Sequence, residues 1–315
     1  MKKWIKFELS IVLFAVIIGT FESCNEIVAR NNEDTATNET IVKPNPRKPL
    51  SKEFKEYWYA GNAEITSYKL EQARYGELRV GTSVLIYVTE PFLADKQVKA
   101  DRSNPENISV LKLNSTKKYL TGIYPYSIMS SSFYPVHDNQ QALKVTFSAQ
   151  EWCGQVFAQI NNREKFKIKT FSYFESEGDN AFELDKNVME NELWNRIRIN
   201  PLDLPVGEFK MIPSLEYVRL AHKELKAYNT ITTLTKMDGM NTYKITYPSL
   251  ERTLEIKFNL AFPYAIHSWS ETFKSGFGNK AKTMTSKATK IKTIKTPYWR
   301  QNGSNDISLR DTLGL

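Results

Sequence analysis

Alternation of apolar and polar residues recurs in short runs through most of the chain after residue 53. In residues 166–174 (FKIKTFSYF), aromatic or aliphatic residues alternate with basic or polar ones, which is typical of a strand with one buried and one solvated face. Runs such as 82–89 (TSVLIYVT) are rich in the β-branched and aromatic residues that strands favour. Short turn sequences join most of these runs. The pattern predicts antiparallel strands without parallel strand–helix–strand units.

Counting these runs predicts about 12 to 14 strands, and hence a mainly β chain. The clearest expected strands are 63–70, 82–89, 108–114, 122–133, 142–147, 155–160, 166–174, 215–220, 225–236, 242–247, 253–258, 265–273 and 285–296. The expected architecture is one large curved antiparallel sheet or a partly closed barrel.

One segment, at about 186–199, departs from this alternation. Its apolar residues Val188, Leu193, Trp194 and Ile197 fall at roughly helical spacing. Acidic residues come early in the segment and arginines come late, which suits the helix dipole. We therefore expect one helix here, packed on a face or an end of the sheet.

The N-terminal segment has the three-part layout of a secretory signal. Three lysines precede the apolar core at 11–18, whose eight residues are too few to span a bilayer. A small residue then precedes Cys24. The segment predicts a signal peptide at 1–23, with Cys24 as the lipid-modified first residue of a lipoprotein. The alternative is an ordinary signal peptide or an uncleaved anchor, with Cys24 incidental.

The rest of the chain divides into three parts by composition. Residues 24–52 are polar and hold three prolines, so we expect a flexible tether after the lipidated cysteine. Residues 53–300 should form the β domain, and 301–315 a disordered tail. Thr35 and Thr312 each follow an aspartate, in a short pattern that resembles O-glycosylation sites of exported Bacteroidota proteins.

The formal net charge of +8 is concentrated near the C-terminus, where residues 272–305 contain eight basic side chains and no acidic one. A basic strip can face lipid headgroups, acidic glycans or nucleic acid, and an exported address argues against nucleic acid. The candidate strip is Lys282, Lys287, Lys290, Lys292 and Lys295. The preferred alternative is an edge strand that its lysines protect against pairing with another sheet.

No motif for catalysis, a metal or a nucleotide stands out. Residues 276–281 match GxGxxA, but a threonine-rich strand follows where a dinucleotide site needs a helix. The three histidines, His137, His222 and His267, lie far apart in sequence, which is weak support for a metal site. Cys153 has no partner once Cys24 is acylated, and we expect it to be buried. We predict neither a cofactor nor a metal.

Two sets of residues are candidates for lining a binding site. Aromatic residues crowd the first half of the domain, and an open barrel that binds an apolar or glycan ligand needs such a lining. The candidate ligand contacts are Trp58, Tyr68, Tyr87, Tyr124 and Trp194; the candidate polar lining is Glu64, Glu71, Arg74 and Glu77. The alternative for the aromatic residues is an ordinary core beneath a large sheet.

Residues 58–65 (WYAGNAEI) and 68–77 (YKLEQARYGE) resemble a family of uncharacterised Bacteroidota envelope lipoproteins, and the likeness extends to Pro297-Tyr298-Trp299. The resemblance implies an exported, anchored protein and carries no established activity. Some members bear the label of the Maf septum-formation inhibitor, whose serine-rich strand-to-helix motif is absent here. In layout, the helix at 186–199 and the later strands are similar to periplasmic half-barrels such as the lipoprotein-carrier fold.

These observations predict a non-catalytic lipoprotein of the cell envelope, anchored in the outer membrane through Cys24. Its curved sheet would bind a hydrophobic or glycan ligand, or a partner protein. One alternative is an envelope hydrolase that uses carboxylates in the barrel, such as Glu64, Glu71 and Glu77. The other alternative is a purely structural envelope protein.

Overall fold

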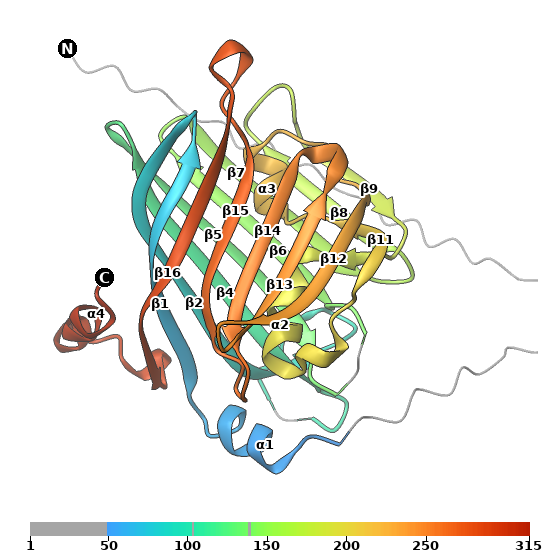
Figure 1. Cartoon of the computed structure of the whole chain (residues 1–315). Helices are drawn as coiled ribbons and strands as arrows, with labels where there is room; N and C mark the ends of the chain where they lie inside the picture. The colour runs from blue at the N-terminus through green and yellow to red at the C-terminus, as the bar shows by residue number, and fades with distance from the viewer. Residues whose placement is uncertain (1–48, 103, 138–139) are drawn as a thin grey trace, which may run out of the picture. The chain divides into compact units, whose positions relative to one another are not determined.

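The computed structural model describes residues 49–102, 104–137 and 140–315. The predictions for the signal peptide, Cys24, Thr35 and most of the tether lie outside the described residues. The described part contains one sheet of sixteen strands (Figure 1), in the order β10-β11-β12-β13-β14-β15-β16-β1-β2-β4-β5-β6-β7-β8-β9, with β3 beside β2. The prediction of a mainly β chain built on one large curved sheet is confirmed, with sixteen strands where about 12 to 14 were expected.

The strands are antiparallel neighbours except for the parallel pair β10–β11. Their bounds are β1 Ala63–Arg74, β2 Glu77–Leu93, β3 Val98–Lys99, β4 Ile108–Thr121, β5 Tyr124–Pro135, β6 Lys144–Glu151, β7 Gly154–Asn162, β8 Phe166–Ser172, β9 Asn180–Leu184, β10 Val188–Met189, β11 Gly207–Ile212, β12 Tyr228–Met237, β13 Met240–Tyr247, β14 Arg252–Asn259, β15 Ile266–Ser275 and β16 Lys282–Thr296. Strands β1 to β9 form one side of the sheet, from its middle to one edge. Strands β10 to β16 form the other side, from the opposite edge back to the middle, so that β16 pairs with β1.

The two edge strands, β9 and β10, are consecutive in the chain. Only residues 185–187 separate Leu184 from Val188, a span of at most about 14 Å. The register of the described strands contains no pairing between β9 and β10, so the sheet is open. The short link therefore holds the two edges of a strongly curved sheet close together without closing it.

Because neighbouring strands alternate in direction, every second turn lies at the same end of the sheet. The turns β1–β2, β4–β5, β6–β7, β13–β14 and β15–β16 lie at the end drawn uppermost in Figure 1, which we call the upper end. The β14–β15 turn and helix α1 (Lys52–Trp58) lie at the opposite, lower end.

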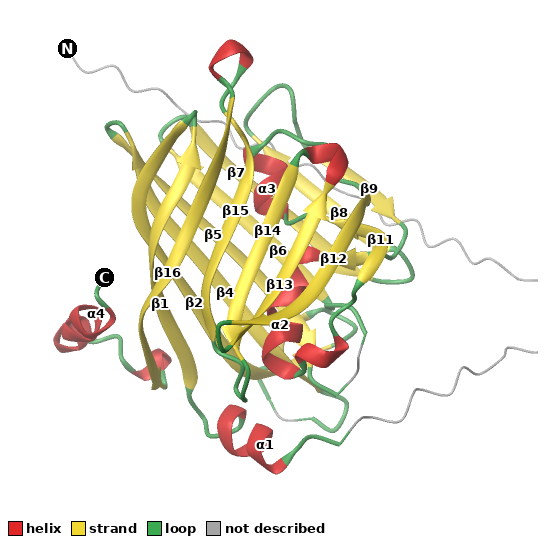
Figure 2. Cartoon of the chain, in the orientation of Figure 1, coloured by secondary structure: helices red, strands yellow, loops and turns green. Residues whose placement is uncertain are grey.

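Helices are short; α2 and α3 lie inside the curve, α1 lies at its lower end, and α4 lies outside the sheet (Figure 2). They are α1, α2 (Glu190–Ile199), α3 (Leu215–Leu220) and α4 (Ser308–Leu313), with 3-10 turns η1 (Pro201–Asp203), η2 (Pro248–Leu250), η3 (Gly278–Lys280), η4 (Tyr298–Arg300) and η5 (Ser304–Ile307). One apolar cluster joins buried side chains of α1, α2 and α3 to those of strands from both sides of the sheet. The sheet therefore curves around a single interior that contains α2 and α3.

Two local predictions differ from the structure. Residues 215–220, expected to be a strand, form α3, because the Ser214 side chain accepts a hydrogen bond from the amide of Tyr217 at 3.2 Å and so caps the first turn. The next strand, β12, begins at Tyr228. Helix α1 was not predicted; Ser51 caps it in the same way, through the amide of Phe54 at 3.1 Å. The helix expected at about 186–199 is α2, which begins at Glu190.

The C-terminal segment, predicted to be a disordered tail, forms η5 and α4 (Figure 1). Leu313 joins a small apolar cluster with Ala63, Ile65 and Val88. Side chains alternate between the two faces along a strand, and Ile65 is three positions from the interior residue Tyr68. The cluster therefore lies on the outer face of β1 and β2. The outer face of these two strands thus gives the last helix an apolar surface on which to fold.

Strand β16, which carries the predicted basic strip, lies between β15 and β1 and is not an edge strand. The interpretation of its lysines as protection for a sheet edge is therefore wrong. A shift in register near Ser67 and Tyr68 also divides the strip between the two faces of the strand. Lys295 lies on the inner side with its Nζ 2.7 Å from the carbonyl oxygen of Tyr57, whereas Lys287 is exposed opposite Glu71.

Candidate functional site

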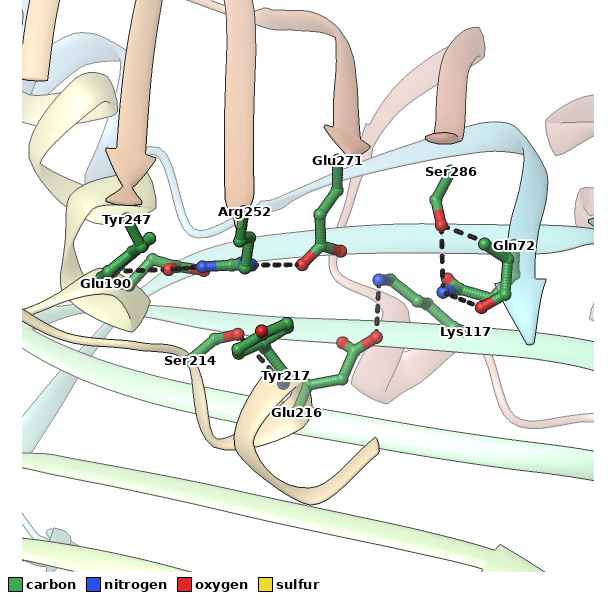
Figure 3. Close-up of polar contacts among 11 residues, drawn as sticks. Gln72, Lys117, Glu190, Ser214, Glu216, Tyr217, Tyr247, Arg252, Glu271 and Ser286 are labelled. Carbon is green, nitrogen blue, oxygen red and sulfur yellow. Dashed lines mark hydrogen bonds and ion pairs between the residues drawn. The ribbon is translucent and has the colours of Figure 1, made fainter. Parts of the chain in front are cut away.

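A network of buried charges crosses the middle of the interior (Figure 3). Arg252 on β14 donates two hydrogen bonds to Glu190 on α2, with N–O distances of 2.5 and 2.7 Å. Its Nε donates to Glu271 on β15 at 2.7 Å, and the hydroxyl of Tyr247 donates to Glu190 at 2.8 Å. Burial alone would raise the pKa of Glu190, but Arg252 and Tyr247 hold it below its ordinary value. The network ties the first turn of α2 to the sheet.

A second pair in the same network ties α3 to the sheet. Lys117 on β4 donates to Glu216 on α3, with an Nζ–Oε1 distance of 2.6 Å (Figure 3). Burial would lower the pKa of Lys117, and the nearby carboxylates Glu216 and Glu271 raise it above the ordinary value. The lysine is therefore held in its charged form.

The cavity inside this network has a volume of about 60 Å³ and is lined by Ser115, Ser131, Trp194, Glu216 and Arg252 among others. A volume of this size admits a few water molecules and excludes a sugar ring or an acyl chain. No group of three or more His, Cys, Asp or Glu side chains among the described residues could hold a metal ion. The network therefore holds α2 and α3 to the sheet, and its cavity is too small to be a ligand site.

A separate buried ion pair closes the lower interior. Arg198 on α2 and Glu64 on β1 form two hydrogen bonds, of 2.7 and 2.6 Å. The hydroxyl of Tyr57 donates to the same carboxylate. The guanidinium carbon lies 5.0 Å from the ring centre of Trp58 and 4.7 Å from that of Tyr87. Burial would raise the pKa of Glu64, but Arg198 keeps it below its ordinary value.

Four of the five predicted ligand contacts come together around this pair. Trp58 and Tyr87 lie against the guanidinium of Arg198, Tyr68 contacts Trp269 with ring centres 4.7 Å apart, and Trp194 contacts Trp269 at 5.3 Å. Trp58, Tyr68 and Tyr87 are each about 1% exposed. These side chains fill the lower interior and leave no space beside them for a ligand. The fifth, Tyr124, lies at the upper end beside Trp152.

The predicted polar lining is dispersed. Glu64 is in the interior, and Glu71, an odd number of positions along the same strand, is on the outer face. Glu77 is exposed at the β1–β2 turn, about 33 Å from Glu64 along the strand. Arg74 is buried and donates to the carbonyl oxygen of Leu220 at 2.7 Å. The three carboxylates of the hydrolase alternative therefore share no cleft.

A cleft of about 660 Å³ with a mainly apolar lining lies at the upper end, between the inner face of β6–β9 and the segment from α3 to residue 226. Val156 and Thr170 are part of its floor, and Phe182 of the edge strand β9 is 37% exposed within it. Leu215 and Val218 of α3 border the other side. Ligand pockets have this size and this mainly apolar lining.

One rim of the cleft carries a small charged group. The Oε1 atom of Glu177, in the β8–β9 turn, lies 3.1 Å from Arg219 Nη1 and 3.1 Å from His222 Nδ1. Burial lowers the pKa of His222, and the positive charge of Arg219 adds to this effect. The cleft therefore combines an apolar floor with a polar group at one side, which suits an amphipathic ligand.

A second space, of about 520 Å³, lies on the other side of α3. Arg74, Leu220, Phe273 and Phe277 contribute to its lining. Arg74 binds the last turn of α3 through the carbonyl oxygen of Leu220. Helix α3 thus fills the upper opening of the curved sheet, with a cavity on either side of it.

Sequence reasoning missed the cleft because residues 215–220 and 225–236 were assigned to two strands. A signal was present, since Pro213 and Ser214 followed by Glu216 resemble the start of a helix. It also missed the partner of Glu190, although Glu190 precedes Leu193 and Ile197 by three and seven positions and so lies on the apolar face of α2. A carboxylate on a buried face needs a cation.

The remaining candidates lie apart from the cleft or on its polar side. Cys153, predicted to be buried, is exposed in the β6–β7 turn. His267 is exposed on β15. Residues 276–281 form the β15–β16 turn with η3 and no long helix, as the sequence indicated. Thr312 lies in α4, where its side chain is exposed.

No protein-family model matches this chain, and no curated protein or solved structure is significantly similar to it. No helix among the described residues is long and apolar enough to cross a membrane.

Proposed function

We propose that this protein is a non-catalytic binding protein that takes an amphipathic ligand, with an acyl or similar apolar part, into the cleft between α3 and β6–β9. The observation that carries the proposal is the cleft itself, with a volume of about 660 Å³ and an apolar floor. Phe182 remains 37% exposed there, although it lies on the inner face of its strand. An apolar side chain left uncovered in a concave space is typical of a ligand site.

The ligand's polar part would lie beside Glu177, Arg219 and His222, where both a carboxylate and a cation are within reach. This arrangement favours a lipid or a lipid-like molecule over a glycan, because a glycan needs many hydrogen-bonding groups along its length and the floor supplies few. Four of the five aromatic residues predicted as ligand contacts, all except Tyr124, instead pack in the core below.

The hydrolase alternative has little support in this geometry. Inside the described domain, Glu64, Glu190 and Glu271 each receive hydrogen bonds from an arginine, and the buried Glu192 accepts one from the amide of Ala142. The cavity beside Glu190 and Glu271 has room for only a few water molecules. A substrate therefore has little room beside these interior carboxylates, and binding is the better supported proposal.

A fluorescent apolar probe, N-phenyl-1-naphthylamine, tests the cleft by titration and by displacement with a fatty acid. Thr170 is half-buried on the inner face of β8 and lines the cleft, so Thr170→Phe fills part of the space without cutting into the core. We expect the affinity for the probe to fall by about tenfold or more. A parent protein that does not bind the probe, or a Thr170→Phe variant that binds it equally well, contradicts the proposal.

The neighbouring residue supplies the matched control. Lys169 is exposed on the outer face of the same strand, so Lys169→Phe introduces the same side chain away from the cleft. This variant should bind the probe within about twofold of the parent. Equal losses for both variants would indicate damage to β8 and not occupation of the cleft.

We further propose that Cys24 is acylated and holds the domain at the membrane of the cell envelope. The sequence around residues 11–24 supports this part of the proposal. The acyl chains of a lipoprotein supply enough buried methylene groups for stable anchoring. Cys24→Ser should therefore move the protein from the membrane fraction to the soluble fraction after cell lysis. If the serine variant stays in the membrane fraction, the anchor is not this cysteine.

A further inference from the structure

Three hairpin turns lie side by side at the upper end of the sheet. They are β15–β16, β1–β2 and β4–β5, whose strands are consecutive in the sheet order. The amide of Gly76 donates to the Ser275 side chain at 3.2 Å, so the first two turns are in contact. The β6–β7 turn follows, and its Trp152 lies 6.4 Å from the ring centre of Tyr124. The four turns form one continuous surface.

Large apolar side chains are exposed along this surface. Ile123 is 82% exposed, Val80 71% and Trp152 69%. The full set, which we call the hairpin rim, is Tyr75, Leu78, Val80, Leu120, Ile123, Trp152 and Phe277. Scattered apolar residues on a surface are ordinary, but a continuous group of this size marks an interaction surface.

The same turns carry an excess of positive charge. Lys118, Lys274, Lys280 and Lys282 are exposed there. The acid of the β1–β2 turn, Glu77, is paired with Arg79 at 2.8 Å, and the other described acids nearby are Glu151 in the β6–β7 turn and Glu71, which lies opposite Val80. The surface therefore combines exposed aromatic and aliphatic side chains with a net positive charge.

We propose that the hairpin rim binds the surface of an anionic lipid bilayer. Tryptophan and tyrosine favour the level of the lipid headgroups, and aliphatic side chains such as Ile123 and Val80 gain by entering the acyl boundary. Lysines beside them attract anionic headgroups. An acidic protein partner would match the lysines but would leave Ile123 and Trp152, at the tips of their turns, with no matching pocket.

The rim also borders a cavity on one side. Tyr75 and Phe277, both part of the rim, line the space of about 520 Å³ beside α3. Contact between the rim and a bilayer would place this opening against the lipid. The surface does not depend on the cleft at β6–β9, so either proposal can fail without the other.

The proposed anchor permits this contact although α1 lies at the lower end. Lys52 follows Cys24 by 28 positions, so the chain between them can extend to about 95 Å. The longest strand, β2, has 17 residues and a length of about 56 Å. The domain can therefore turn its upper end towards the membrane that holds the anchor.

Co-sedimentation with vesicles tests the proposal. The compact unit Asn45–Leu315 contains every described strand and both apolar clusters, so it is used without the N-terminal segment, which would itself bind lipid. Vesicles contain phosphatidylcholine alone or a mixture with phosphatidylglycerol. We expect the unit to bind the mixed vesicles, and Ile123→Ser with Trp152→Ser to reduce this binding by about tenfold or more.

Two further variants complete the test. Lys280→Gln with Lys282→Gln should reduce binding to the mixed vesicles by about tenfold and leave weak binding to neutral vesicles unchanged. Leu202→Ser with Val206→Ser is the matched control, because these side chains are 85% and 61% exposed near the lower end. It should bind mixed vesicles within about twofold of the parent.

Three results would overturn the proposal. The first is a parent unit that does not sediment with mixed vesicles. The second is an equal loss of binding in the lower-end control. The third is a dimer in solution that Ile123→Ser with Trp152→Ser dissociates while vesicle binding is absent, which would assign the rim to a contact with a second copy. Probe binding in the cleft is measured on the same variants and should stay unchanged in each case.

Discussion

The lower and upper halves of the interior are built differently around their helices. In the lower half, Arg198 of α2 and Glu64 are each about 1% exposed and form two hydrogen bonds with each other. Aromatic rings lie on the guanidinium of this pair. In the upper half, Arg219 of α3 and Glu177 are 15% and 25% exposed and border a cleft of about 660 Å³. An arginine–glutamate pair is thus buried in the closed lower end, and another borders the open cleft at the upper end.

The difference in burial between the two ion pairs indicates that α2 is held more firmly than α3. A buried pair loses its hydration, and its attraction must offset that cost through close geometry and further hydrogen bonds. Arg198 meets this need through Glu64 and through the carbonyl oxygen of Pro263 at 2.8 Å. Helix α3 is held by Lys117 below and Arg74 beside it, with open space on two sides. The tightly packed ion pair therefore lies in the lower interior, and the open space beside a helix, where we propose that a ligand binds, lies in the upper one.

Removal of Arg198 should give the largest effect on stability. Arg198→Leu leaves the Glu64 carboxylate buried without its cation, which we expect to cost about 3–5 kcal/mol of unfolding free energy. Urea denaturation of the Asn45–Leu315 unit measures this cost. The double variant Glu64→Leu with Arg198→Leu should recover most of the loss, because no charge is then left unpaired.

The upper pair is the control for this comparison. Arg219→Leu should cost at most about 1 kcal/mol, since the pair is partly solvated. The comparison between the two halves fails if the Arg219 variant is as unstable as the Arg198 variant. It also fails if the double variant at Glu64 and Arg198 recovers none of the stability.

The parts of this fold that follow from local sequence could be predicted. Alternation in segments such as 166–174 identifies strands, because one face of each strand is buried against the interior. Helix α2 follows from the spacing of Leu193, Trp194 and Ile197. The curved sheet then follows, because many short antiparallel strands must bury their apolar faces against one another.

What could not be predicted depends on contacts between distant residues. Arg198 and Glu64 are 134 positions apart, and no local pattern relates them. The six residues of α3 are too few to show helical periodicity, so valine and tyrosine within them favoured a strand. The position of β16 between β15 and β1 depends on the return of the whole chain to its first strand. The candidate cleft arises from these same distant contacts.

Besides Glu64 and Glu190, the interior contains a further buried carboxylate, Glu192, which should make the stability of the lower interior depend on pH. Glu192 of α2 accepts a hydrogen bond from the amide of Ala142 at 2.7 Å, and its nearest cation, Arg196, is 3.7 Å away. Burial raises the pKa of Glu192 to about 7, in contrast to the lowered values of Glu64 and Glu190. The folded state therefore keeps a proton on Glu192 at a pH where the unfolded state has lost it.

The sign of the resulting effect follows from this difference in bound protons. Because the folded pKa lies above the unfolded value of about 4.5, the stability that Glu192 contributes is present below pH 4.5 and declines as the pH rises to about 7. The expected decline is about 3 kcal/mol. Glu192→Gln does not titrate, so the difference in unfolding free energy between parent and variant should shift by about this amount between pH 4.5 and 8. A constant difference across this range would show that Glu192 has an ordinary pKa and that the lower interior admits water.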